Sequence, residues 1–96
     1  QHWSQSVHWM MTLQLNISGV RDALLDRLKE KGIDCRQMIY PVHEAQHFKQ
    51  HFDDRAYPVS KQVSYNSLHL PSSTNLTEEQ IEWITGTFQE ALKEFV

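Results

Sequence analysis

The stretch GIDCRQMIYPVHEAQHFKQH, residues Gly32 to His51, organises the rest of the chain. Gly32 follows an amphipathic run and is the residue type that most often ends a helix. From Ile33 to Tyr40 apolar and polar side chains alternate with the period of a β-strand, and Pro41 ends that strand because proline has no N–H to donate to a ladder. Three histidines then recur every fourth residue from position 43. Most of the chemistry that the sequence offers therefore lies in this stretch.

The segment before this stretch predicts a strand and then a helix. Apolar and polar residues alternate from Val7 to Leu15, which is typical of a half-buried strand. Apolar residues then recur at helical spacing from Val20 to Leu28. We expect an amphipathic helix there, with Ser18 as its N-cap and Gly32 just past its end.

The segment after it predicts further short elements and one well-signalled helix. Residues 43–52 are expected to form a short helix or a loop with one turn, Pro58 to begin a short helix, and residues 67–71 to form a short strand stopped by proline. Thr77 and Gln80 have the spacing of a capping box at the start of the last helix. Its predicted buried stripe comprises Ile81, Ile84, Phe88, Leu92 and Phe95.

This order of elements predicts an α/β chain built as an α+β two-layer sandwich. We expect a small, mainly antiparallel, three-stranded sheet with helices on one face. Trp9 and Met10 are neighbours in a predicted strand, so both faces of the sheet carry a large apolar group. The face without helices is therefore expected to be covered by a partner domain or subunit. Residues 1–6 read as a frayed start or linker, and residues 7–96 as one domain.

Composition excludes several classes of function. The chain has 9 basic and 12 acidic residues and a net charge of −3, which argues against a nucleic-acid partner. No apolar run approaches the roughly 20 residues that span a bilayer, so no membrane partner is expected. The single cysteine, Cys35, cannot form an internal disulfide. We expect it to be a small buried apolar residue, in a protein of a reducing, cytoplasmic compartment.

One possible metal site lies at His43-Glu44-Ala45-Gln46-His47, which spells H-E-x-x-H. Two histidines four residues apart on a helix can share a zinc ion, and the glutamate can act as general base. The context argues against a zinc hydrolase, because Pro41 would make the helix begin at its first ligand and the segment is short and polar. We therefore predict no metal ligands here, and a histidine-rich surface turn instead.

Arg36 is the residue of most functional interest. It lies in the predicted strand on the face opposite Ile33 and Cys35, so it points away from the helix-packed core. It is either an ordinary solvent-facing residue or one wall of a cleft that pairs with a phosphate or carboxylate. Tyr40 points to the same side, and His43 follows the proline turn.

Three segments in order resemble a known family. These are VHWMM at 7–11, CRQMIYPVH at 35–43 and SLHLPSSTNLTEEQI at 67–81. They are similar to the C-terminal small domain of DegT/DnrJ-type sugar aminotransferases of the perosamine-synthase-like kind, over nearly the whole chain. The resemblance implies the aspartate-aminotransferase fold (fold type I), with the large domain that binds pyridoxal phosphate absent from this chain.

The resemblance also implies a function. The parent enzyme would transfer an amino group, commonly from glutamate, to a keto-sugar nucleotide, and would be a homodimer with pyridoxal phosphate as cofactor. This chain alone would be inactive and would bind no cofactor, so none of its lysines is assigned as catalytic. Arg36, Tyr40 and His43 fall where the family's R-x-x-x-x-P-x-H region approaches the substrate. The alternatives are a non-catalytic binding or dimerisation module of the same fold and, less favoured, the zinc hydrolase.

Overall fold

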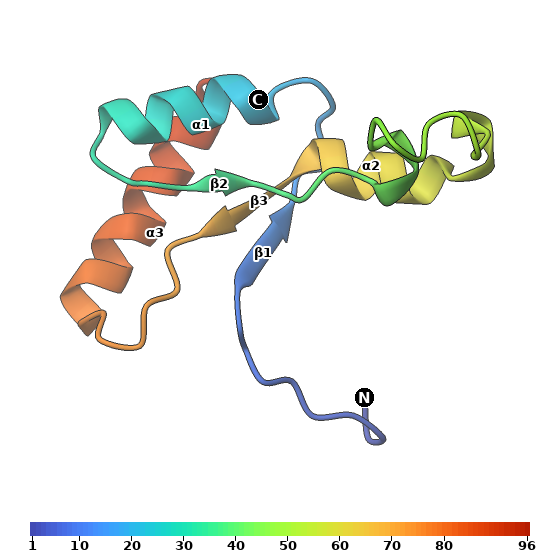
Figure 1. Cartoon of the computed structure of the whole chain (residues 1–96). Helices are drawn as coiled ribbons and strands as arrows, with labels where there is room; N and C mark the ends of the chain where they lie inside the picture. The colour runs from blue at the N-terminus through green and yellow to red at the C-terminus, as the bar shows by residue number, and fades with distance from the viewer.

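The computed structural model of the chain describes residues 1–96, apart from the side chain of Asp54. Strands β1 (Met11–Gln14), β2 (Arg36–Gln37) and β3 (Ser67–Leu70) form one antiparallel sheet in the order β1-β3-β2. Helices α1 (Arg21–Glu30) and α3 (Glu78–Lys93) cover one face of this sheet, and α2 (Pro58–Asn66) leads directly into β3 (Figure 1). The predicted two-layer fold with a three-stranded antiparallel sheet is confirmed.

The core lies between the sheet and the two covering helices. Leu68 of β3 and Leu24 and Leu28 of α1 are fully buried, and half-buried Leu13 and Leu70 pack against them. Leu68 pairs with Leu13 across the β1–β3 ladder, so both side chains face the helices. The remaining buried apolar residues are Leu15, Ile33, Ile84, Phe88 and Ala91.

The end of α1 follows from its glycine. The backbone N–H of Gly32 donates to the carbonyl of Lys29 and that of Ile33 to the carbonyl of Leu28. These two bonds form a Schellman motif, which needs a left-handed residue at its centre. Gly32 has φ +85° and supplies it, so the predicted helix stop is confirmed. The predicted N-cap is wrong, because Val20 occupies that position and Ser18 accepts a hydrogen bond from Asn66 instead.

The start of α3 also follows from local signals. The hydroxyl of Thr77 accepts from the Gln80 N–H, and the Gln80 side chain accepts from the Thr77 N–H, so the capping box is confirmed. The predicted buried stripe is confirmed except at its first residue. Ile84 and Phe88 are buried and Leu92 and Phe95 pack against the core, whereas Ile81 is 50% exposed.

Both outer strands are shorter than predicted. The alternating pattern begins at Val7, yet β1 begins at Met11. Met11 pairs with Leu70, so Met10 would pair with Pro71, which has no N–H to donate to the ladder. The second strand, predicted over Ile33 to Tyr40, pairs only at β2, and Ile39 is exposed rather than facing the core.

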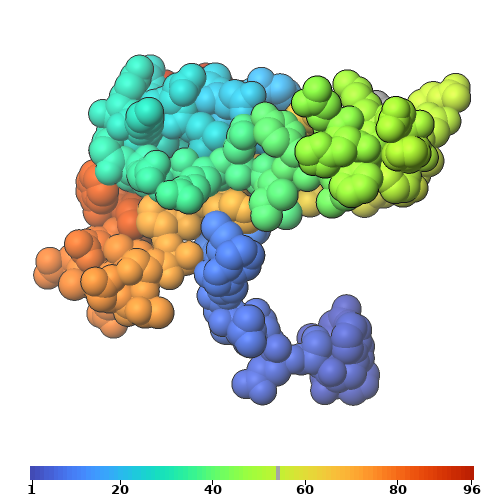
Figure 2. Space-filling view, in the orientation of Figure 1, coloured from blue at the N-terminus to red at the C-terminus, as the bar shows by residue number. Residues whose placement is uncertain are grey.

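The chain is elongated rather than spherical. Its radius of gyration is 15.6 Å, whereas a compact chain of this length has about 12.5 Å. Two projections account for the difference. An extended arm before β1 stands away from the body, and the segment between β2 and α2 forms a lobe at the end opposite α3 (Figure 2).

Candidate functional site

Arg36 lies on the sheet face that carries no helix, which we call the open face. Arg36 pairs with His69 across the β2–β3 ladder, and His69 pairs with Thr12 across the β1–β3 ladder. Directly paired residues share a face of an antiparallel sheet, so the three side chains form one row. The Thr12 hydroxyl lies 2.9 Å from Nδ1 of His69. Arg36 is exposed at one end of this row, and its predicted direction away from the helices is therefore confirmed.

The open face also holds two buried polar atoms that lack a partner. His69 is 7% exposed, and its Nε2 has no hydrogen-bond partner among the described residues. Ser67 is two residues earlier on the same strand, so it shares that face; its fully buried hydroxyl also has no partner in the described part of the chain. Such atoms are uncommon in folded proteins, because burying a polar atom without a hydrogen-bond partner costs free energy.

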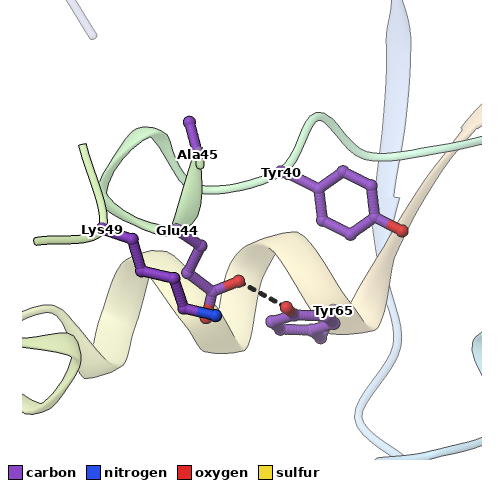
Figure 3. Close-up of a pocket in the computed structure, with 5 residues that line it drawn as sticks. All are labelled: Tyr40, Glu44, Ala45, Lys49 and Tyr65. Atoms are coloured by element: carbon purple, nitrogen blue, oxygen red, sulfur yellow. Dashed lines mark hydrogen bonds between the residues drawn. The ribbon is translucent and has the colours of Figure 1, made fainter. Parts of the chain in front are cut away.

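Tyr40 lines a cleft of about 600 Å³ in the lobe. The other lining residues are Glu44, Ala45, Lys49 and Tyr65 (Figure 3). The phenol of Tyr65 donates a hydrogen bond to the Glu44 carboxylate. The Tyr40 ring packs edge-on against the Tyr65 ring, with centroids 6.2 Å apart. Aromatic faces, a carboxylate and an ammonium group are therefore brought to one opening.

The Glu44 carboxylate is held between two residues of α2. Its other oxygen lies 3.5 Å from Nζ of Lys61, and its side chain is only 18% exposed. The hydrogen bond to this carboxylate is the main reason why the pKa of Tyr65 is raised, with burial and the Glu44 charge adding to it. The phenol therefore keeps its proton.

His43 does not line this cleft. Its ring is buried and stacks on Tyr57 with centroids 4.7 Å apart. It borders a separate hollow of about 220 Å³ together with Val42, Phe52, Tyr57 and Ser60. The three residues predicted from sequence therefore lie in three settings: Arg36 on the open face, Tyr40 in the cleft and His43 inside the lobe.

The geometry does not support the zinc motif. Residues 42–44 form a 3-10 turn that ends at Ala45, so His43 and His47 do not share one face of an α-helix. His47 packs instead against Phe48, with ring centroids 5.8 Å apart, and Glu44 is held by Tyr65. Within the described residues no three side chains of His, Cys, Asp or Glu lie close enough to hold a metal ion.

The residues present do not fit pyridoxal phosphate. A Schiff-base lysine needs an enclosed pocket with groups for the phosphate and the pyridine nitrogen. Lys29, Lys31, Lys49 and Lys93 are exposed, and Lys61 lies against Glu44. The single thiol, Cys35, is half-buried against the core, and burial raises its pKa to about 11, so it is a poor nucleophile.

Sequence reasoning missed Glu44, Tyr65 and His69 as members of these sites. In the sequence, Glu44 stands out only as part of the metal motif. Tyr65 and His69 lie 14 and 18 residues beyond His51, the end of the central stretch, so only the tertiary fold brings them to it. The period-two pattern of Ser67 and His69 was the one available signal, because it puts two polar residues on one face of a strand.

No helix among the described residues is long and apolar enough to cross a membrane. The model of the DegT/DnrJ/EryC1/StrS aminotransferase family matches residues 1–89. The chain is 25% identical over 83 residues to the GDP-perosamine synthase of Escherichia coli O157:H7, which covers 86% of this chain and 22% of that protein. It is 30% identical over 64 residues to the enzyme of the same name from Vibrio cholerae, covering 67% of this chain and 17% of that protein.

Solved structures agree on the fold. The aminotransferase TlmJ from Streptoalloteichus hindustanus superposes with a TM-score of 0.83 at 20% identity, over 96% of this chain and 24% of that one. A Streptococcus pneumoniae protein described as a sugar aminotransferase, in its PMP form, gives a TM-score of 0.83 at 21% identity, over 91% and 23%. The chain thus spans about a fifth of the length of its relatives. Since the family model covers most of the sequence, the chain belongs to the DegT/DnrJ/EryC1/StrS aminotransferase family.

Proposed function

We propose that this chain is the C-terminal domain of a sugar aminotransferase dependent on pyridoxal phosphate, and that a larger domain outside the chain binds the cofactor. The observation that carries the proposal is the family match over residues 1–89 together with relatives several times longer than the chain. The parent enzyme transfers an amino group, with glutamate as donor, to a keto-sugar nucleotide. The names of the perosamine synthases support the sugar-nucleotide class of substrate.

The open face is the surface that meets the larger domain. The Ser67 hydroxyl and Nε2 of His69 support this, because both are buried without a hydrogen-bond partner among the described residues, and a covering segment that repacks this face would supply one. Exposed apolar side chains line a hollow together with His69, including Trp9, which is 75% exposed, and Ile39, which is 66% exposed. Buried polar atoms surrounded by exposed apolar groups are typical of a surface that is closed in the complete protein.

Within that assembly Arg36, Tyr40 and His43 form this chain's wall of the substrate cleft. The exposed guanidinium of Arg36 presents donors in a fork that suits a phosphate or carboxylate. Tyr40 offers an aromatic face and a hydroxyl at the mouth of the lobe cleft. His43 lies behind it and fixes the turn through its stack on Tyr57. The chain thus binds and orients substrate, while the larger domain carries the catalytic lysine.

Two measurements test this proposal. The purified chain mixed with pyridoxal phosphate should show no Schiff-base absorbance and no transaminase activity. A stoichiometric lysine adduct trapped by borohydride would contradict it. The reading frame upstream of Gln1 should encode, in frame, a large domain with a lysine that forms the Schiff base, and a stop codon immediately upstream would contradict the proposal as well.

A binding or dimerisation module of the same fold is the second candidate. The exposed apolar side chains of the arm favour it, since Trp3, Val7 and Trp9 are each more than 70% exposed. Such a module would close its open face by self-association. Sedimentation velocity at low and high concentration separates the two candidates, because a concentration-dependent dimer is expected only for the module.

A further inference from the structure

We infer that Glu44 is a positioning residue that holds the turn of residues 40–44 on α2, and so sets where Tyr40 and His43 lie. The functional meaning of this inference rests on the proposed substrate role of those two residues. The geometry stands by itself. The Glu44 side chain crosses from the turn to α2 and makes two polar contacts there, one with Tyr65 (Figure 3) and one with Lys61.

The two contacts come from one side of α2. Lys61 and Tyr65 are four residues apart in a helix, so they lie one above the other on the same face. They take different oxygens of the carboxylate, since the phenol donates to Oε2 and the ammonium group lies near Oε1. A carboxylate bound through both oxygens is fixed in rotation as well as in position. The turn that carries Glu44 is thereby tied to α2.

Both proposed substrate residues depend on this arrangement. His43 precedes Glu44 in the same 3-10 turn, so fixing Glu44 fixes the direction in which the His43 ring leaves the backbone. That ring reaches Tyr57, the residue that caps α2. Tyr40 packs on the Tyr65 ring, whose own position is set by the hydrogen bond to Glu44. One carboxylate thus orders two side chains.

Other contacts also order the turn. Just before the turn, the Ser64 hydroxyl of α2 donates to the backbone carbonyl of Ile39 at 2.8 Å. That bond holds the chain before Pro41, whereas the His43 ring on Tyr57 and the Glu44 carboxylate both hold the turn after it. Beyond the turn, residues 45–53 are bends and turns without a strand or an α-helix.

The test is NMR on the 96-residue chain labelled with ¹³C at histidine and tyrosine. In the unchanged chain the His43 ring protons should be shifted upfield by the Tyr57 ring, and Tyr65 should ionise at a higher pH than an unperturbed phenol. Glu44→Ala should move the His43 signals toward those of an exposed histidine and lower the pKa of Tyr65. Glu44→Gln, which keeps an acceptor for the phenol, should largely preserve the His43 position.

Glu82→Ala is the matched control, since Glu82 is exposed on α3 and far along the chain from the turn. It should change neither signal. The inference is overturned if Glu44→Ala lowers the Tyr65 pKa and leaves the His43 ring where it was. It is also overturned if Tyr65 titrates identically with and without Glu44. Should Glu44→Ala unfold, Tyr65→Phe takes its place, because it removes the same hydrogen bond. The His43 signals of Tyr65→Phe are then compared with those of Glu44→Gln.

Failure of the proposed function would look different. If His43→Ala and Tyr40→Phe leave KM for the sugar nucleotide unchanged in the complete enzyme, these residues do not contact substrate. The NMR result on the isolated chain is independent of substrate and still decides whether Glu44 positions them.

Discussion

Arg21 shows how far the role of one residue depends on distant parts of the chain. In the sequence it is one polar residue of an amphipathic helix, yet its side chain is only 4% exposed. Nη1 donates to the carbonyl of Ser64 at 2.6 Å, and Nη2 donates to the side-chain oxygen of Gln37 at 3.4 Å. Nε donates to the Asp22 carboxylate at 2.8 Å. The last carbonyls of α2 have no helical partner, and the guanidinium satisfies one of them.

Arg21→Ala should therefore cost about 2–3 kcal/mol of unfolding free energy, because it leaves the buried Ser64 carbonyl without a donor and opens a space under β2. Urea denaturation followed by circular dichroism measures this. Arg55→Ala is the control, because the Arg55 side chain is 90% exposed, and a change within about 0.5 kcal/mol is expected there. Equal losses at both positions would contradict the assignment.

At the scale of elements, the end of α1 and the start of α3 were predictable, whereas the start of α1 and the ends of the strands were not. The Schellman motif at Gly32 and the capping box at Thr77 involve residues only a few positions apart, so their signals are complete within the local sequence. A strand ends where its partner ends. The pattern from Val7 onward is a good strand pattern, but β3 offers no partner beyond Leu70. A local period in the sequence cannot predict where two strands more than 50 residues apart will pair.

The glycines of these helices make a paired prediction. Gly32→Ala should destabilise the chain by about 1 kcal/mol, because Gly32 has φ +85° and a Cβ is strained in that conformation. Crowding adds little, since the new Cβ would lie 3.8 Å from Trp83. Gly86→Ala should instead stabilise it by up to about 1 kcal/mol, because Gly86 lies inside α3 and its Cβ would meet nothing within 4 Å. Thermal denaturation of the two variants should shift in opposite directions, and shifts of the same sign would refute the argument.

At the scale of the whole molecule, some features of the site could be predicted from the sequence and others could not. The direction of Arg36 followed from the strand period, whereas Trp9 and Met10, from which a covered face was expected, lie before β1. The cleft between Glu44 and Tyr65 did not follow, because α2 must fold back on the turn to create it. The place of His43 inside the lobe likewise depends on Tyr57, which reaches it from the start of α2.

Ser67→Ala should behave oppositely in the isolated chain and in a complete enzyme. Alone, the chain loses a buried hydroxyl that has no partner among the described residues, so its stability should stay equal or rise by up to about 1 kcal/mol. Where a covering domain supplies the hydrogen bond, the same change should be destabilising. Ser64→Ala is the control and should destabilise in both settings, because the Ser64 hydroxyl is bonded to the Ile39 carbonyl. Differential scanning calorimetry of both forms measures this, and the same loss for Ser67→Ala in both would count against a covered face.

The strand order β1-β3-β2 also governs how this domain can fold as it is synthesised. The two outer strands never pair with each other, and the strand that joins them is the last of the three to be made. No part of the sheet can form until residues 67–70 have left the ribosome. The apolar side chains of α1 and β1 therefore stay unpacked until β3 has been made. A nascent chain stopped before Ser67 has helical segments but no sheet on which to pack them. Assembly is then a single late event, in which one short strand closes both ladders.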